Sequence, residues 1–486
     1  MLLIAATLLA PLLGGLALPL LRFRSRRARA WYVEAVTLTT SVLAALLCFD
    51  AAPAAVELIR FTDNLALTLR VDDMSRVFIG LIAFLWPLAT LYAFEYMAHE
   101  NRENAFFSWY TLSYAATLGI ALAGNLFSLY IFYESLTLAT LPLVSHKRDP
   151  RSVRAGSHYL LYSLFGAALA FTGMMVLGHY GAGADFVLGG GLNAEASAHL
   201  TLLRVCFVIA FIGFSVKSAM FPLYAWLPEA SVAPTPVTAL LHAVAVVNAG
   251  AYACLRLVYY SVGTELASGT WAQAVVLGLA AFTVVFGSVM AVREKHFKRR
   301  LAYSTVSNLS YILLGAALMT PAGMTGALTH LVSHGLMKIT LFYCAGAILI
   351  KTGKEYVQEL RGMGRVMPVT FAAMTVSGLA LVGVPPLCGF LSKWNLLTAA
   401  AEHGTALGVI AIAALILSAI LTAIYIMSVV ISAYFLPLND DALAGKNQDP
   451  SWLIKCPLIV LCCAVIALGL HGAAFTGWLQ GIAGLL

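Results

Sequence analysis

The sequence predicts an all-α membrane protein with about 14 transmembrane helices, built from two inverted five-helix repeats with broken helices 7 and 12. The first observation is composition: 61% of the residues are hydrophobic and 10% are charged, whereas soluble domains carry roughly 25% charged residues. The second is that apolar runs of about 20 residues, the length that crosses a bilayer core, recur along all 486 residues. The third is that prolines interrupt two runs, at Pro222 and at the pair Pro385 and Pro386.

Charged or Gly/Pro-rich connections set the limits of each predicted span. In chain order the spans cover residues 2–21, 31–49, 74–97, 106–123, 125–145, 155–180, 200–227, 235–261, 271–293, 301–319, 323–350, 368–400, 406–436 and 453–484. The segment 61–70, FTDNLALTLR, alternates polar and apolar residues and predicts a short strand or hairpin outside the membrane. The spans form four predicted units: helices 1–3 (1–105), the first repeat (106–262), the second repeat (271–437) and helix 14 (452–486).

The distribution of basic residues predicts the orientation. Lysines and arginines concentrate in the connections after spans 1, 5, 9 and 11, and the connections after spans 6, 8, 10 and 12 contain none. Because basic loops stay on the cytoplasmic side, we expect both termini outside, in a multi-pass protein of the inner (plasma) membrane. The broken spans 7 and 12 lie five spans apart and so run in opposite directions. This pattern is typical of an inverted repeat with ion sites near the breaks.

Several titratable side chains lie deep inside these spans, where a charge costs at least about 2.5–3.5 kcal/mol. They are Glu134, Lys217, His242, His330, His334, Lys338 and Lys393. The three in span 11 are four residues apart and therefore share one helix face. Burial disfavours the charged form of a lysine and a nearby carboxylate favours it. We therefore predict a Glu134–Lys217 pair that acts as a latch on a proton path, beside prolines that free backbone carbonyls and admit water.

Other polar residues have simpler interpretations. A lone histidine such as His242 on an apolar helix is often a packing residue, and Arg204 and Arg256 lie near span ends, where we expect them to snorkel. The eight cysteines show no C-x-x-C spacing and are interpreted as packing residues. His330 and His334 could ligate zinc in an intramembrane metalloenzyme, but neither an adjacent glutamate nor a third ligand is evident.

Long motifs resemble those of a known family. They include FYESLTLATLPL around Glu134, VKSAMFPLYAWLPEASVAPTPVTALLHAVAVVNAG from Val216, HLVSHGLMKITLFYCAG from His330 and LVGVPPLCGFLSKW before Asn395. Over about residues 70–435 the chain resembles the antiporter-like subunits shared by respiratory complex I, membrane-bound hydrogenases or formate hydrogenlyase, and Mrp-type Na+/H+ antiporters. The resemblance implies a proton-translocating subunit, with Na+ as a further candidate ion.

The resemblance also implies roles for the buried groups. Glu134 and Lys217 match the first half-channel, the groups His242, His330, His334 and Lys338 match the central axis, and Lys393 matches the second half-channel. No redox motif is present, so we expect no cofactor in this chain and electron transfer, if any, in partner subunits. The expected partners are other antiporter-like membrane subunits and, in a complex I-like parent, iron–sulfur or hydrogenase-type peripheral subunits; nucleic acid is not expected.

Two departures from the family pattern remain. Asn248 stands where many D-type members carry a lysine, and an amide cannot accept and release a proton. The sequence ends at Leu486 without a long lateral helix, which favours a D-like or hydrogenase-type relative. The alternative from another class is a free-standing secondary transporter of a small solute, with its site at the broken helices.

Overall fold

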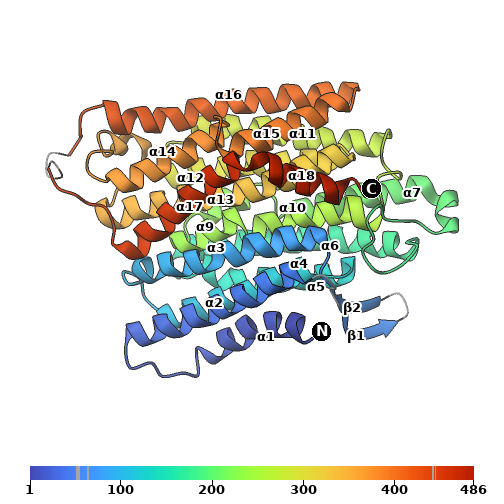
Figure 1. The fold of residues 1–486 in the computed structure, drawn as a ribbon, viewed down its shortest axis with the longest axis horizontal. Coiled ribbons are helices and arrows are strands. Elements are labelled where there is room, and N and C mark those ends of the chain that lie inside the picture. Colours follow the sequence, from blue (N-terminus) through green and yellow to red (C-terminus); the bar gives the residue numbers. More distant parts are fainter. Residues whose placement is uncertain (51–54, 63–64, 441–442, 444) are drawn as a thin grey trace.

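The computed structural model describes residues 1–50, 55–62, 65–440, 443 and 445–486. Long helices lie side by side along one common direction (Figure 1). Both termini lie toward the end of the helices that carries the small hairpin. The all-α membrane class predicted from composition is confirmed.

The helices follow the predicted spans closely. Their bounds are α1 Leu2–Ala17, α2 Arg26–Phe49, α3 Asp73–Met97, α4 Glu103–Leu122, α5 Leu126–Val144, α6 Pro150–His179, η1 Ala194–His199, α7 Leu200–Ser215, α8 Trp226–Ala230, α9 Thr235–Ala243, α10 Val246–Arg256, the π-turn η2 Leu257–Ser261, α11 Trp271–Arg293, α12 Phe297–Ala317, α13 Pro321–Thr352, η3 Val357–Leu360, α14 Pro368–Val382, α15 Cys388–Glu402, α16 Ala406–Phe435, α17 Trp452–Leu470 and α18 Gly472–Ala483.

Length and apolar composition allow 11 helical segments among the described residues to cross a membrane. Two shorter apolar helices, α1 and α14, add to these. Every predicted span coincides with one helix or with two consecutive helices. The exact number of 14 crossings stays a prediction.

A two-stranded antiparallel hairpin, β1 Val56–Thr62 and β2 Leu65–Leu69, precedes α3. It confirms the predicted hairpin, of which residues 63–64 lie outside the described residues. Asn125, the N-cap of α5, connects the hairpin to this helix. Its Nδ2 donates to the Ala66 carbonyl at 2.8 Å, and its Oδ1 accepts from the Ser128 amide at 2.7 Å. The hairpin is thereby fastened to the helix that carries Glu134.

The predicted break in helix 7 lies between α7 and α8, and Lys217 sits within it. Within the break, the Trp226 indole donates to the Val216 carbonyl at 2.9 Å. The Ser218 hydroxyl donates to the Val247 carbonyl of α10 at 2.9 Å and so links the break to that helix. A Cβ at Gly250 would come within 2.8 Å of the Ser218 amide nitrogen and 3.0 Å of the Lys217 Cβ. Glycine at this position therefore lets α10 pack directly on the break.

The predicted break in helix 12 separates α14 from α15. Helix α14 ends at Gly383, whose φ of +98° favours glycine. Lys393 of α15 reaches back and donates to the Leu381 and Val382 carbonyls at 2.7 and 2.9 Å. A candidate proton-transfer lysine thus caps the first half of its own broken helix.

The predicted span 235–261 is present, but an interruption that was not predicted, at Val244 and Ala245, separates α9 from α10. Neither proline nor glycine marks this break. The carbonyls freed there find side-chain donors, since the Asn248 amide donates to the Ala243 carbonyl at 2.8 Å and His334 donates to the His242 carbonyl at 3.0 Å. Side chains inserted into the hydrogen-bond ladder open a helix in this way. The predicted span 453–484 is likewise two helices, α17 and α18.

Candidate functional site

The first half of the site joins α5 to the broken helix 7. Lys217 Nζ lies 3.6 Å from Glu134 Oε1, and the lysine side chain is only 1% exposed. The ammonium also donates to the Tyr133 carbonyl and lies 3.4 Å from the centroid of the Tyr133 ring. The Tyr133 hydroxyl in turn donates to the Phe214 carbonyl at 2.9 Å, just before the break. Tyr133 therefore fixes the position of the lysine, while the carboxylate is near enough to stabilise its charge.

The central part of the site lies on α13, as the four-residue spacing predicted. The rings of His330 and His334 have centroids 6.2 Å apart, and His334 Nε2 donates to the carbonyl of His242. Lys338, one turn further on, donates to the Leu301 carbonyl at 3.1 Å and to the Ser304 hydroxyl. All four side chains are completely buried. The structure thus brings α9, α12 and α13 together around these side chains. We call the set of buried titratable groups from Glu134 to Lys393 the polar row.

The second half of the site connects the central part to Lys393. The ring of Tyr311 stacks on His330 with centroids 5.0 Å apart, and Lys393 Nζ lies 5.6 Å from the centroid of the same ring. His330 Nδ1 is hydrogen-bonded to Ser392 Oγ at 3.0 Å, and Ser392 directly precedes Lys393. Tyr311 and Ser392 therefore bridge α13 and the broken helix 12, and sequence reasoning identified neither of them.

Several buried polar atoms along the row have no protein hydrogen-bond partner. They are Nδ1 and Nε2 of His242, Nε2 of His330, Nδ1 of His334, Oδ1 of Asn248 and Oδ1 of Asn308. Buried polar groups of this kind are normally satisfied by internal water. These atoms belong to α9, α10, α12 and α13.

Among the described residues of the polar row, Glu134 is the only one with a carboxylate. Lys338 and Lys393 form no ion pair with any described residue, and their ammonium groups contact carbonyl and hydroxyl oxygens instead. These lysines are therefore not held in the charged form by a fixed counter-ion. Such groups can exchange a proton with neighbouring water when the local charge changes.

A metal centre finds no support in the described part of the chain, where no group of three or more His, Cys, Asp or Glu side chains is placed to hold an ion. His330 and His334 use one nitrogen each on Ser392 and on the His242 carbonyl. Their free nitrogens belong to the polar row described above.

The expectation that Arg256 snorkels is wrong. Its guanidinium is completely buried and binds Asp72 through two nitrogens, at 2.5 and 2.7 Å. The Ser75 and Tyr252 hydroxyls accept further hydrogen bonds at 2.8 and 2.6 Å. A charge near a span end has the same sequence pattern whether it reaches for water or for a carboxylate on another helix. Asp72, at the N-cap of α3, is the partner that the sequence did not reveal.

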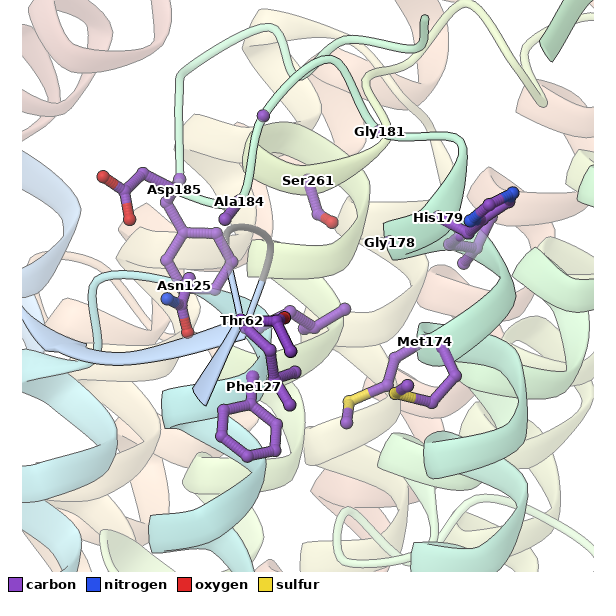
Figure 2. Close-up of a pocket in the computed structure, with 16 residues that line it drawn as sticks. Thr62, Asn125, Phe127, Met174, Gly178, His179, Gly181, Ala184, Asp185 and Ser261 are labelled. Carbon is purple, nitrogen blue, oxygen red and sulfur yellow. The ribbon is translucent and has the colours of Figure 1, made fainter. Parts of the chain in front are cut away.

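Two cavities lie at opposite ends of the helices. The first, of about 340 Å³, lies beside the hairpin and is lined by Asn125, Phe127, Met174, His179 and Asp185 among others (Figure 2). None of the predicted site residues lines it. The second, of about 420 Å³, lies among the basic connections and is lined by Lys147, Arg151, Ser231, His296 and Lys298 among others. Burial lowers the pKa of His296, although Glu355, 3.6 Å from its Nε2, opposes this shift.

Comparison with known families gives two matches. Residues 123–421 match the family described as NADH:quinone oxidoreductase/Mrp antiporter, transmembrane. Residues 60–107 match the family described as NADH-ubiquinone oxidoreductase (complex I), chain 5 N-terminus. The first match contains the whole polar row from Glu134 to Lys393.

Individual proteins agree with these matches. NADH-quinone oxidoreductase subunit N of Desulforudis audaxviator is 33% identical over 425 residues, which cover 82% of this chain and 81% of the relative. Na+/H+ antiporter subunit A1 of Staphylococcus haemolyticus is 29% identical over 496 residues, so that the chain spans 60% of that relative's length. A chain in the structure of the Mrp complex from Dietzia sp. DQ12-45-1b superimposes with a TM-score of 0.84 at 25% identity, covering 99% of this chain and 52% of that one.

Proposed function

Because the chain belongs to the NADH:quinone oxidoreductase/Mrp antiporter family of membrane subunits, we propose that it translocates protons as one subunit of a multisubunit membrane complex. The observation that carries the proposal is the buried row of titratable groups from Glu134 to Lys393, with unpartnered polar atoms between them. A row of this kind is costly in a membrane and is characteristic of proton relays.

In the proposed path, Glu134 and Lys217 form the first half-channel. With the latch closed, the carboxylate favours the charged lysine; when Glu134 is drawn away, Lys217 releases its proton toward the central axis. His242, His330, His334 and Lys338 carry it along α13 through intervening water. Lys393 then exchanges it with the opposite side. The two half-channels correspond to the proposed repeats, 106–262 and 271–437.

The relay across helix 8 is proposed to run through water held at the α9–α10 break. Asn248 cannot titrate, but its amide satisfies the Ala243 carbonyl and leaves Oδ1 free to accept a hydrogen bond from water. His242 offers two ring nitrogens beside it.

Asn248→Ala is expected to slow proton transport several-fold and to destabilise the protein by about 1–3 kcal/mol, because the buried Ala243 carbonyl loses its donor. The rate is measured in vesicles and the stability by thermal unfolding in detergent. The matched control is Asn439→Ala, which also removes a bond to a carbonyl, that of Gln358 at 3.1 Å, but at an exposed site. Equal effects of the two variants would contradict a role for the helix 8 break.

The proposed partners are other membrane subunits. The side chain of Glu134 is 23% exposed although it lies mid-way along α5. A carboxylate facing lipid at that depth is costly, which supports a neighbouring subunit covering it. The proposal also includes a D-type assignment and, in a complex I-like parent, peripheral iron–sulfur or hydrogenase-type subunits. The driving reaction and coupling to Na+ are parts of the same proposal. So is a location in the plasma membrane with both termini outside.

The proposal is tested on the complex purified through this chain in mild detergent. We expect several antiporter-like membrane proteins to copurify, and proteoliposomes of the complex to show proton transport that an uncoupler collapses. A chain that purifies alone and carries a small solute by itself would instead establish a secondary transporter. The identity of the copurifying subunits also distinguishes a gradient-driven antiporter from an electron-transfer complex.

A further inference from the structure

Lys298 is a buried lysine that the proposed proton path does not use. In the sequence it belongs to the basic connection REKHFKRR, whose lysines and arginines indicate orientation only. In the structure it is the second residue of α12 and is 7% exposed, whereas its neighbours Lys295 and Arg299 are exposed. A buried ammonium next to an exposed basic segment needs its own physical explanation.

No carboxylate compensates this charge. Lys298 Nζ donates to the Ala233 carbonyl at 3.2 Å, and none of the ion pairs among the described residues includes Lys298. Arg299, the next residue, pairs with Glu294 at 3.5 Å. The charges that act on Lys298 from the surrounding elements are those of Lys147, Glu355 and Glu100, and they do not form contacts with it. Lys298 is therefore free to change its protonation state without breaking an ion pair.

Lys298 forms part of the wall of the second cavity, the one of about 420 Å³. Residues of four segments line this cavity: the connection and first turn of α6, the end of α8, the start of α12 and the end of α13. Two unpartnered buried atoms, Ser231 Oγ and His296 Nδ1, belong to lining residues. The cavity has room for several water molecules at roughly 30 Å³ each, and its rim is built from the basic connections.

Lys298 shares α12 with two residues that contact the central axis. Two lysine charges act on His242, that of Lys338 and that of Lys298. Along α12, Leu301 and Ser304 follow Lys298 by one and two turns, and both accept hydrogen bonds from Lys338. A rise of about 1.5 Å per residue puts Ser304 roughly 9 Å beyond Lys298 along the helix. Lys298 thus lines the cavity and lies on the same helix as two hydrogen-bond partners of Lys338.

We propose that the cavity at the basic end is the mouth through which water-borne protons reach the central axis, and that Lys298 is the proton-transferring group at its inner wall. Neutral Lys298 accepts a proton from cavity water and passes it through water to His242, which returns the lysine to its neutral form. This inference rests on the proposed function, since it adds a water-side entry to the central axis of the same path. Lys298 would then transfer protons in addition to contributing to the membrane orientation of the chain.

The test uses inverted membrane vesicles carrying the assembled complex, in which the basic end faces the medium in the proposed orientation. Lys298→Ala is expected to lower the rate of coupled proton uptake about ten-fold or more, and Lys298→Arg, which keeps the charge but does not release protons, is expected to remain slow. Imidazole or methylamine added to the medium should enter the cavity and restore a substantial part of the rate in Lys298→Ala. The exposed Lys295→Ala is the matched control and should transport at the wild-type rate, with no response to either base.

Each outcome decides the inference. A wild-type rate in Lys298→Ala overturns it, and so does a full rate in Lys298→Arg, which would show that a fixed charge suffices. A loss that neither base relieves overturns it as well, because the role would then be structural. If the wild-type complex itself moves no protons, the proposed function is wrong. If the wild-type complex and Lys298→Ala both transport protons but Lys217→Ala does not, the proposed function holds and only the role of Lys298 is wrong.

Discussion

Lys217→Ala is expected to abolish coupled proton transport by the assembled complex, with a loss of about 100-fold or more, as for removal of an essential proton-transfer group. The ammonium of Lys217 lies 3.6 Å from the Glu134 carboxylate, and Lys217 itself lies in the break between α7 and α8. Alanine leaves no titratable group at this point, and Glu134 loses its counter-ion. The rate is followed with a pH-sensitive dye in inverted vesicles after the complex is driven by its own reaction or gradient.

The matched control is Lys455→Ala in α17. Lys455 lies near the helix start with its ammonium 4.6 Å from the centroid of the Trp452 ring, away from the polar row. We expect this variant to transport at the wild-type rate. Lys217→Arg should resemble Lys217→Ala, because arginine keeps a cation but does not release its proton. Wild-type transport by Lys217→Ala would contradict the proposed first half-channel.

Asp72→Asn is expected to destabilise the folded protein by about 3–5 kcal/mol, because it leaves the Arg256 guanidinium buried without a counter-ion. The Arg256 guanidinium donates two hydrogen bonds to the Asp72 carboxylate, at 2.5 and 2.7 Å, and so joins α10 to the start of α3. Asparagine is as good an N-cap as aspartate, so the start of α3 should persist and the loss should report on the charge pair. Thermal unfolding in detergent and the amount of folded protein in the membrane measure the effect.

Asp73→Asn, one residue further on, provides the comparison. Asp73 pairs with Arg76 at 2.8 Å, but its side chain is 47% exposed. Exposed pairs contribute about 0–1 kcal/mol, so this variant should unfold close to wild type. If both substitutions cost the same, the Asp72–Arg256 pair is not the tie between α3 and α10 that the structure indicates.

Much of the architecture could be predicted because each span must itself be long and apolar enough to cross the hydrocarbon core of the bilayer. Apolar length identified the helices, and the prolines at Pro222 and Pro385 located two breaks. The third break, at Val244 and Ala245, was not predictable from local sequence. Its donors, Asn248 and His334, come from another turn and from another helix, so only the packed structure shows that the broken ladder is satisfied.

The candidate site divides in the same way. Charged residues such as Lys217 and Lys338 are conspicuous in an apolar run, so the sequence identified them without a partner. Tyr311 and Ser392 are ordinary residues for a membrane helix, and their place between His330 and Lys393 depends on how α12, α13 and α15 meet. Arg256 was misjudged because a basic residue near a span end has one sequence pattern and several possible surroundings.

The sequence by itself determined that this chain crosses a membrane many times, that prolines interrupt two of its helices, and that several titratable groups lie deep inside the apolar spans. These features follow from transfer free energy and helix geometry, which act on each segment separately. Only the tertiary structure decided which buried groups meet, which carbonyls a side chain satisfies, and which lysine faces a cavity and which faces a carboxylate. Those outcomes depend on distances of a few ångströms between helices far apart in the sequence, because hydrogen bonds and ion pairs weaken steeply beyond that range.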